Sequence, residues 1–413
     1  MLSRRKLFVA SGVGLLGAIS GSALAQVGLN PTRGAGPRGD IVVNVFLRGG
    51  LDGLSAVAPY QEANYYDARP STAIAAPDST KANARDRLLR LDDQFGLHPA
   101  LAALYPLYES KQLGLVTAAG SGDRTRSHFE AMSLMERGTG NAGDAGSNGW
   151  MARLLAARET TGSPLRAVAF ATTMPDTLRG ATDALALESL AQFKLDGDAQ
   201  AIRAMYSTGG DVLTTSGRET LRVLESLEST DSAKFRPQNG AVYPDTELGR
   251  GLQQTATLIR SEIGLELAFL ERTGWDTHVA QGGSTGLLAT MLTDVAQSLA
   301  AFSQDLGTEM GRVSVVVQTE FGRRVAENAG LGTDHGRASV MFLMGGGFIG
   351  GKVHGTFPGL SKEILEGPGD VPVTTDYRQV WSEVLTKRVP GVDPVRVFGP
   401  DIGPAIGVCQ GSI

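Results

Sequence analysis

Short, almost wholly apolar runs recur along the chain, and they limit its possible folds more than any other feature. The first, "IVVNVFL" at 41–47, is rich in β-branched residues, as expected for a strand buried on both faces of a sheet. Similar runs occupy 113–121, 165–170, 265–271, 313–320 and 340–347. A helix is predicted over 284–305, and its single apolar stripe consists of Leu288, Met291, Leu292, Val295, Leu299 and Phe302. Strands that alternate with helices predict an α/β fold, with a mostly parallel central sheet and helices on both faces.

The composition narrows the classes of function. With 413 residues, 42% of them hydrophobic, the chain is long enough to bury a large core. A formal net charge of -5 lacks the basic surplus that a nucleic-acid-binding protein needs, so we expect no nucleic-acid partner. The single cysteine, Cys409, excludes an internal disulfide, a cysteine-based zinc site and an iron–sulfur cluster. Any bound metal must therefore use histidine, carboxylate or hydroxyl ligands.

The N-terminus has the pattern of an export signal. Arg4 and Arg5 precede a glycine- and alanine-rich stretch that ends in Ala23-Leu24-Ala25, which predicts a twin-arginine signal peptide over 1–25. The alternative is a membrane anchor, but the stretch is too short and too glycine-rich to span a bilayer comfortably. We therefore expect a periplasmic or secreted protein with no stable membrane span after signal cleavage.

The rest of the chain is predicted to form one domain. Residues 26–38 are a linker rich in glycine, proline and arginine, and the folded domain is expected over 39–413. Within it, the stretch from about 187 to 262 is more polar and helical in pattern, and it is broken by "STGGD" and "FRPQNGAVYPD". This stretch is predicted to be a helical insertion.

Acids and histidines follow most of the predicted strands. Ligands of open α/β sheets collect beyond the carboxyl ends of the strands, so these residues are expected to lie together. Four of the five histidines are among them. The candidates, in chain order, are Asp52 with Ser55, Ser127 with His128, Asp276 with His278, Glu320 with Arg323, Asp334 with His335, and His354. The fifth histidine, His98, precedes a proline at a helix start and is expected to cap or pack.

Carboxylates, imidazoles and one hydroxyl at a sheet edge indicate a divalent-metal site. Oxygen and nitrogen donors suit Zn, Mn, Mg or Ca, and two ions held close together would stabilise phosphoryl or sulfuryl transfer. Ser127, at a predicted helix start, is a sensible nucleophile because metal coordination lowers the pKa of a hydroxyl. Four neighbouring arginines are candidates for gripping a tetrahedral oxyanion: Arg48, Arg126, Arg323 and Arg337.

The motifs, taken together, resemble a known family. "LRGGLDGLSAVAPY", "LHPAL", "RSHFEA", "GWDTHVAQ", "TEFGRR", "GTDHGRA" and "MGGGFIGGKVHG" occur in the order found in the exported domain-of-unknown-function 1501 family. That family belongs to the alkaline phosphatase and sulfatase-like clan, and the resemblance covers nearly the whole mature chain. It implies an alkaline-phosphatase-like three-layer sandwich. An exported protein partner is implied in the same way.

The resemblance also assigns roles at the predicted site. Asp52 resembles the clan's first metal-binding acid, and Ser127 occupies the place of the nucleophile. His128, Arg126 and Arg48 are further catalytic candidates because they follow predicted strands. Asp276 and His278 resemble the middle ligand pair, Asp334-His335 the clan's Asp-His pair, and His354 its late histidine. The "DTH" spacing of Asp276 and His278 departs from the clan pattern, in which the two residues lie a helical turn apart.

A second departure leaves two assignments open. Glu320 occupies the strand-end position where the clan often has its Asp-His pair, so either Glu320 or Asp334 is the strand-end ligand. In the first case His335 is the late histidine and His354 lies outside the site.

Two functions follow from these expectations. The first is an exported hydrolase that binds one or two divalent ions and cleaves a small anionic phosphate or sulfate ester. Ser127 lacks the proline and arginine offsets of a formylglycine sulfatase, so that subclass is disfavoured. The alternative is a non-catalytic exported surface or assembly factor that keeps the fold.

Overall fold

The computed structural model describes most of the chain. It describes residues 40–140, 148–158, 165–190, 199–211 and 236–411, together with positions 214, 217, 218, 221, 222, 224 and 225. The predicted signal peptide and linker, 1–25 and 26–38, lie outside the described residues. Within the described part, no helix is long and apolar enough to cross a membrane.

A nine-stranded sheet forms the centre of the molecule. Its main path is β13-β5-β12-β9-β1-β8-β6-β7, and β14 pairs with β5. The strands are β1 (Ile41–Leu47), β5 (Leu113–Gly120), β6 (Ala167–Phe170), β7 (Ala184–Leu187), β8 (Leu267–Arg272), β9 (Val313–Gln318), β12 (Ser339–Gly345), β13 (Val353–His354) and β14 (Thr375–Asp376). All neighbours pair in parallel except β12, which runs antiparallel to both β5 and β9. The predicted mostly parallel sheet is therefore confirmed.

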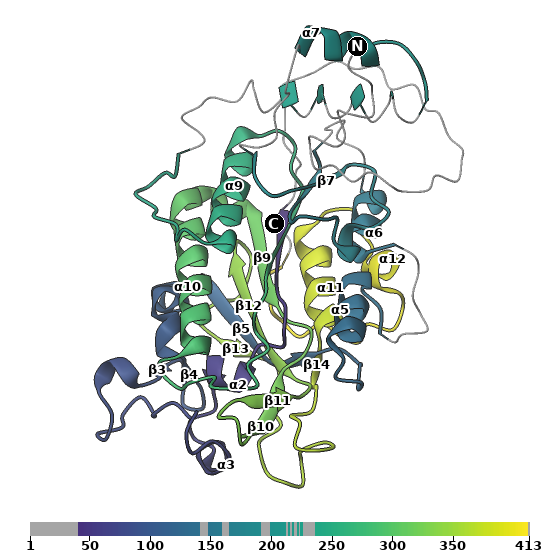
Figure 1. The fold of residues 1–413 in the computed structure, drawn as a ribbon. Helices are drawn as coiled ribbons and strands as arrows, with labels where there is room; N and C mark the ends of the chain where they lie inside the picture. Colours follow the sequence, from purple (N-terminus) through teal and green to yellow (C-terminus); the bar gives the residue numbers. More distant parts are fainter. Residues whose placement is uncertain are drawn as a thin grey trace.

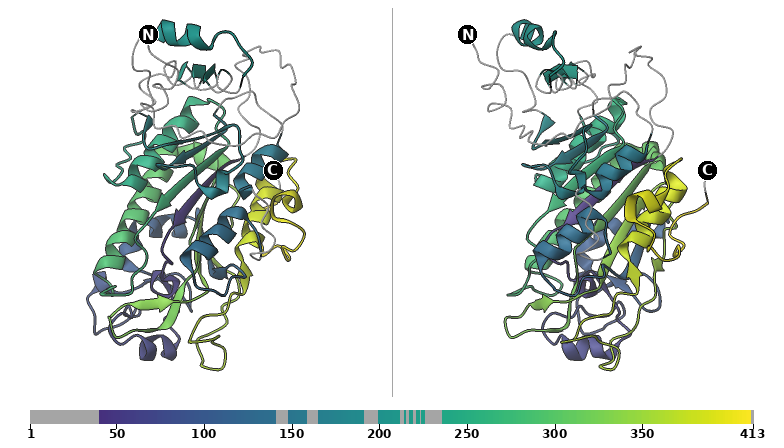
Figure 2. Two further views of the ribbon diagram at one scale, coloured as in Figure 1. Left: turned by 45° about the vertical axis from the view of Figure 1, so that its right-hand side comes forward. Right: turned by 90° about the vertical axis from the view of Figure 1, so that its right-hand side faces the viewer.

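Helices cover both faces of this sheet (Figures 1 and 2). One face carries η2 (Pro99–Leu104), α4 (Tyr105–Glu109), α9 (Glu247–Ser261) and α10 (Leu287–Leu306). The other carries α5 (His128–Arg137), α6 (Trp150–Ala157), α11 (Tyr377–Arg388) and α12 (Pro394–Phe398). A hydrophobic core lies on each face of the sheet, between the strands and the covering helices. In strand β1, Val43 and Val45 point into the first core, on the face of α9 and α10, whereas Val42 and Phe46 point into the second. This alternation gives the three-layer sandwich that the sequence predicted.

Helix α10 shows how the apolar stripe is used. All six predicted stripe residues are at most 4% exposed and belong to the first core. Burying a large apolar side chain contributes about 1.5–3 kcal/mol, so the stripe fixes the helix firmly against the sheet. The helix begins after Gly286 and ends at Gly307, whose φ of 51° places it in the left-handed region that glycine tolerates best.

The predicted insertion is described in part. It contains α7 (Ala199–Tyr206) and ends in α9. Helix α9 packs against β8 and α10, and Leu248, Leu252 and Ile259 lie in the first core. Helix α9 therefore belongs to one of the helical layers that cover the sheet. For the residues between about 187 and the start of α9, a helical insertion remains a prediction.

Smaller elements gather beyond the carboxyl ends of β1, β8 and β9, at the lower end of the molecule in Figure 1. Two of them form a hairpin, β10 (Arg323–Glu327) with β11 (Thr333–His335). A three-stranded sheet has the order β2-β4-β3, with β2 (Val57–Ala58), β3 (Leu89–Arg90) and β4 (Gly96–Leu97). The helices α2 (Gly53–Ala56) and α3 (Ala63–Ala68) and the turn η1 (Ala84–Asp86) also belong to this part of the chain. Elsewhere in the described residues, η4 (Asp176–Leu178) lies between β6 and β7, and η7 (Gly307–Arg312) leads into the start of β9.

Candidate metal centre

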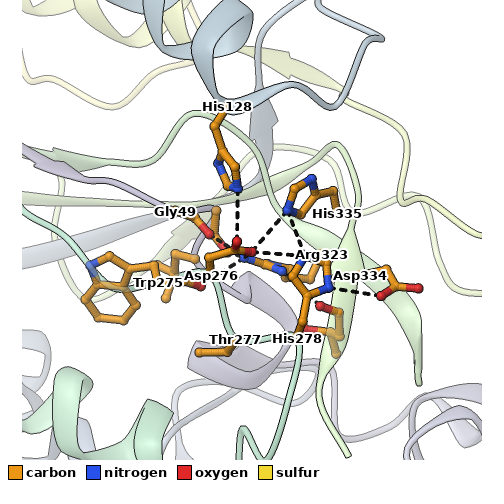
Figure 3. A network of polar contacts seen from close by, with 12 residues as sticks. Gly49, His128, Trp275, Asp276, Thr277, His278, Arg323, Asp334 and His335 are labelled. Atoms are coloured by element: carbon orange, nitrogen blue, oxygen red, sulfur yellow. Dashed lines mark hydrogen bonds and ion pairs between the residues drawn. The ribbon is translucent and has the colours of Figure 1, made fainter. Parts of the chain in front are cut away.

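Three histidines and one aspartate meet beyond the carboxyl ends of the central strands (Figure 3). His128 is the first residue of α5, Asp276 and His278 follow β8, and His335 ends β11. One potential ligand atom from each of His128, Asp276 and His335 lies within 4.8 Å of the others. His278 joins them, because its Nε2 is 3.1 Å from Asp276 Oδ1 and 2.9 Å from His335 Nε2. We call these four residues the histidine cluster.

Each histidine of the cluster has its Nδ1 engaged by an oxygen acceptor. Nδ1 of His128 is 2.7 Å from Glu320 Oε1, and Nδ1 of His278 is 3.0 Å from Asp334 Oδ1. Nδ1 of His335 is 2.9 Å from the carbonyl oxygen of Arg126. Metal-binding histidines are usually oriented in this way by a carboxylate or a carbonyl, which places the proton on one nitrogen and leaves the other free to coordinate.

The three Nε2 atoms share a single carboxylate, that of Asp276, as their nearest oxygen acceptor. The Nε2 atom of His128 is buried without a hydrogen-bond partner and lies 3.5 Å from Asp276 Oδ2. Those of His278 and His335 are 2.9 Å apart, and with both Nδ1 atoms protonated the neutral rings would set lone pair against lone pair. A cation between these nitrogens would remove the conflict. The donor set therefore fits a divalent metal ion.

Asp276 is held ready as an ionised acceptor. Arg323, which is fully buried, donates from Nη2 to Asp276 Oδ1 at 2.7 Å, and His335 Nε2 lies 3.0 Å from the same oxygen. Burial would raise the pKa of Asp276, but Arg323 and the two neighbouring histidines outweigh it and lower the pKa to about 2. The side chain remains 47% exposed, so solutes reach it from outside.

The histidines differ in their affinity for protons. The hydrogen bond to Glu320 raises the pKa of His128, whereas burial lowers the pKa of His335 despite its contact with Asp276. A raised pKa means that a proton competes with a metal more strongly at His128 than at His335.

Gly49 allows the loop after β1 to approach the cluster. Its φ is 122°, and a Cβ there would lie 2.6 Å from the backbone nitrogen of Asp276. Its own N–H donates to Glu320 Oε1 at 2.8 Å. The "RGG" turn is therefore needed for close packing as well as for chain reversal.

Glu320 and Asp334 both lie outside the inner group. Glu320 is fully buried, and its carboxylate is shared among His128, Gly49 and the hydroxyl of Thr319. Asp334 accepts from the side chain of Asn328 at 2.9 Å in addition to its contact with His278. The hydrogen bond from Asn328 is the main cause of the lowered pKa of Asp334. Each of these two acids therefore contacts the Nδ1 atom of a histidine of the cluster.

The structure does not bring Asp52 or His354 to the cluster. Asp52 is fully buried and accepts two hydrogen bonds from Arg69, at 2.6 and 3.1 Å, and others from Ser55 and Gln281. Burial would raise its pKa, but Arg69 lowers it, so its charge is already balanced. His354 lies on β13, and its Nε2 is 2.7 Å from the carbonyl oxygen of Ile349. Both placements differ from the predicted ligand roles, because each side chain has partners of its own.

Ser127 precedes His128 at the start of α5. It occupies the N-cap position, but its hydroxyl makes no capping hydrogen bond to the helix. The fifth histidine, His98, caps η2 as expected, because its Nδ1 accepts from the backbone N–H of Ala100 at 3.0 Å.

The four predicted anion-gripping arginines are each paired with an acid. Arg323 contacts Asp276, and the other pairs are Arg48 with Glu136 and Glu271, Arg126 with Asp370, and Arg337 with Glu366. Sequence reasoning missed Arg324, Asn328 and Asp370, which lie around the cluster. Of these, Arg324 was signalled by its place beside Arg323, whereas Asp370 lies in a turn that carries no such signal.

The fold and the cluster define an α/β protein with a histidine-rich candidate metal site at the carboxyl edge of its sheet. Residues 40–385 match a family model described as "Protein of unknown function (DUF1501)", and the chain belongs to this family, as the motifs predicted. No curated protein matches the chain.

Several solved structures are similar to the chain at low identity. The C-terminal periplasmic domain of EcEptC from Escherichia coli, in complex with Zn, is 12% identical with a TM-score of 0.37, over 90% of this chain and 89% of that chain. Ps i-CgsB in complex with k-i-k-neocarrahexaose is 10% identical with a TM-score of 0.38, over 84% and 72%. Alkaline phosphatase from the Antarctic bacterium TAB5 is 11% identical with a TM-score of 0.30, over 74% and 92%.

Proposed function

We propose that the protein is an exported metal-dependent hydrolase of a phosphate or sulfate ester, with its metal held by the histidine cluster. The observation that carries this proposal is the orientation of three imidazoles, each engaged through Nδ1, around one ionised aspartate. Three nitrogen donors and one oxygen donor favour zinc over magnesium or calcium, which prefer oxygen ligands. Three of these donors, from His128, Asp276 and His335, lie within 4.8 Å of one another, and His278 beside them would complete four donors for a single ion. A second ion would need further acidic ligands, but Glu320 and Asp334 already accept hydrogen bonds from residues of the protein.

A bound ion of this kind would act as a Lewis acid and lower the pKa of a hydroxyl or water. The chain places Ser127 beside His128, at the N-terminus of the ten-residue helix α5, where the backbone dipole favours negative charge. Its hydroxyl is not used to cap the helix, which supports a role as nucleophile. Glu320 fixes the ring of His128, and Arg323 keeps Asp276 ionised. Because the side chain of Asp276 is 47% exposed, the cluster is accessible from solvent.

A second candidate is a non-catalytic exported factor that binds metal, acting with another exported protein. One observation favours it: the arginines predicted to grip an oxyanion are ion-paired with acids of this chain. In a hydrolase the metal itself would have to attract the substrate.

Elemental analysis and turnover assays separate these candidates. The mature protein, purified without chelator, should retain about one equivalent of a divalent ion, and less than about a tenth would contradict a metal centre. The metal-loaded protein should then hydrolyse p-nitrophenyl phosphate or p-nitrophenyl sulfate. Ser127→Ala should abolish turnover while metal content stays unchanged. Full metal loading with no turnover of either ester would favour the non-catalytic factor.

Export through the twin-arginine pathway is proposed from Arg4 and Arg5. Replacing both with lysine should leave the precursor in the cytoplasm, as fractionation and immunoblotting would show. An unchanged periplasmic yield would contradict this route.

A further inference from the structure

A tight turn at 366–370, "EGPGD", lies against the loops that supply the histidine cluster. The backbone N–H groups of Glu366 and Asp370 each donate to the carbonyl oxygen of the other residue at 2.9 Å, which closes the turn. The turn is docked on β10, because Val325 donates its N–H to the carbonyl oxygen of Gly369 at 3.0 Å. Its position is therefore fixed relative to the hairpin that carries His335.

Asp370 is a fully buried carboxylate that faces two arginines. Arg126 donates from Nε to Asp370 Oδ2 at 2.7 Å and makes a second, shorter contact with the same oxygen through Nη2. Arg324 Nε lies 4.0 Å from Asp370 Oδ1, and neither of these two buried atoms has a hydrogen-bond partner. Asp370 thus holds Arg126 tightly and Arg324 more loosely.

The arm through Arg126 reaches His335. Arg126 has a φ of 57°, a conformation that a non-glycine residue adopts at a cost, and its carbonyl oxygen accepts from His335 Nδ1 at 2.9 Å. The ion pair with Asp370 holds the residue in this conformation. Packing leaves little freedom, since a Cβ on Gly367 would lie 2.8 Å from Nη2 of Arg126.

The arm through Arg324 reaches His278. Nη1 of Arg324 is 3.3 Å from Asp334 Oδ2, and Asp334 Oδ1 is 3.0 Å from His278 Nδ1. The same turn also contacts the segment after His335, where the guanidinium of Arg337 pairs with the carboxylate of Glu366. Three arginines, Arg126 and Arg337 from loops and Arg324 from β10, are therefore gathered by two acids of one turn.

We propose that this turn is a positioning clamp, in which Asp370 acts through Arg126 and Arg324 to fix the rings of His335 and His278 for metal binding. The inference rests on the proposed metal centre. It also gives the paired arginines a role that needs no substrate: their charges order the ligand loops. The charged partners of Asp370 are Arg126 and Arg324 and not the residues of the histidine cluster, so its proposed role is that of a positioning residue.

The clamp is tested by metal titration of Asp370→Asn, which keeps the size of the side chain and removes its charge. A matched control is Asp40→Asn, because Asp40 is likewise buried and paired with an arginine, Arg388, but precedes β1 at the opposite end of the sheet. Zinc affinity is measured by chelator competition, and the cobalt-substituted proteins are compared by visible absorption. Melting temperatures of the metal-free proteins report stability separately.

We expect Asp370→Asn to weaken zinc binding by about tenfold or more, the scale of outer ligand-orienting residues. The cobalt absorption should change in the same variant, because the ring geometry at His335 changes. Asp40→Asn should alter neither readout, although it too lowers the melting temperature. If Asp370→Asn does not fold, Arg126→Gln removes the other partner of the same ion pair, and Arg126 is partly exposed. This variant should show the same weaker zinc binding and the same change in cobalt absorption.

Two results would overturn the clamp, and they are distinguishable. If the wild type binds zinc tightly and Asp370→Asn and Arg126→Gln match it in affinity and cobalt spectrum, the turn is structural and the metal centre stands. If the wild type binds neither zinc nor cobalt, the metal centre fails and the clamp fails with it.

Discussion

The two ends of the central sheet both bury charge, but they neutralise it differently. At the amino end, Asp40 accepts from Nε and Nη2 of Arg388 at 2.7 and 2.6 Å, and Glu266 accepts from Arg166 at 2.7 and 3.1 Å. At the carboxyl end, His128 Nε2 has no hydrogen-bond partner and two other imidazole nitrogens face each other at 2.9 Å.

The difference separates a structural use of charge from a binding use. A carboxylate matched by an arginine is complete within the fold and needs no ligand. A set of nitrogen and oxygen donors that converge on one another can be matched by a cation that they coordinate together. This contrast between arginine-matched carboxylates and the converging imidazoles makes the histidine cluster the candidate site.

The largest effect should come from breaking the amino-end pair. Asp40→Asn leaves the buried guanidinium of Arg388 without a countercharge, so we expect a loss of about 3 to 5 kcal/mol in the free energy of unfolding. Urea denaturation of the metal-free protein would measure it. Zinc affinity should not change. If Asp40→Asn lost less than about 1 kcal/mol of unfolding free energy and bound zinc more weakly, the amino end would be the binding end and not the structural one.

The second effect, at the carboxyl end, should have the opposite signature. His335→Gln removes one of four donors, and since a structural zinc site binds with about 10–16 kcal/mol, we expect a loss of about 3 kcal/mol in zinc binding. This corresponds to more than a hundredfold in affinity, measured by chelator competition. The metal-free protein should be no less stable, because the conflict between His278 and His335 is relieved. Equal zinc affinities of variant and wild type would contradict the cluster as ligand set.

A smaller effect concerns His98, a fully buried histidine with both ring nitrogens satisfied by the backbone. Ala100 N–H donates to Nδ1, and Nε2 is 3.0 Å from the carbonyl oxygen of Gly283. Burial lowers its pKa from 6.5 to about 4, so the unfolded chain binds the proton more readily. The contribution of His98 to the free energy of unfolding is therefore fully present above about pH 6.5 and is lost as the pH falls toward 4.

The expected contribution of His98 between pH 7 and pH 5 is about 2 kcal/mol of unfolding free energy. His98→Gln retains one hydrogen-bond donor and one acceptor but does not titrate. Its free energy of unfolding should therefore lack this dependence on pH. Denaturation of both proteins at the two pH values measures the difference. Parallel pH profiles would mean that His98 is not a neutral, backbone-satisfied histidine in the native state.

The sequence predicted the sheet better than its strand directions. Apolar runs locate β1, β5 and β9, because burial on both faces requires them. The same kind of run predicts β12, but an apolar run does not show whether the strand is parallel or antiparallel to its neighbours. The direction depends on where the chain re-enters the sheet, and the short return from His335 to Ser339 makes it antiparallel.

The candidate site was predicted as a set, and its internal order was not. Strand-end placement brought out Asp276, His278, His335 and His128, because the carboxyl ends of parallel strands share an edge. It also brought out Asp52, whose partner Arg69 lies on no motif and becomes visible only in three dimensions. Whether a carboxylate binds a metal or orients a histidine depends on distances of an ångström or two, which spacing along the chain does not encode.

The antiparallel course of β12 has a consequence for how the chain tolerates change in length. His335 ends β11, and only residues 336–338 separate it from the first residue of β12. Four steps of about 3.8 Å between consecutive Cα atoms set the longest reach of this tether. The tether is also tied down, since Gly336 donates its N–H to Gly322 and Ser339 donates its hydroxyl to Leu51. An inserted residue would have to break these hydrogen bonds or shift β12 against its neighbours. The length of this segment should therefore be constant in related chains even where other surface loops grow, and an alignment of such chains would test that expectation.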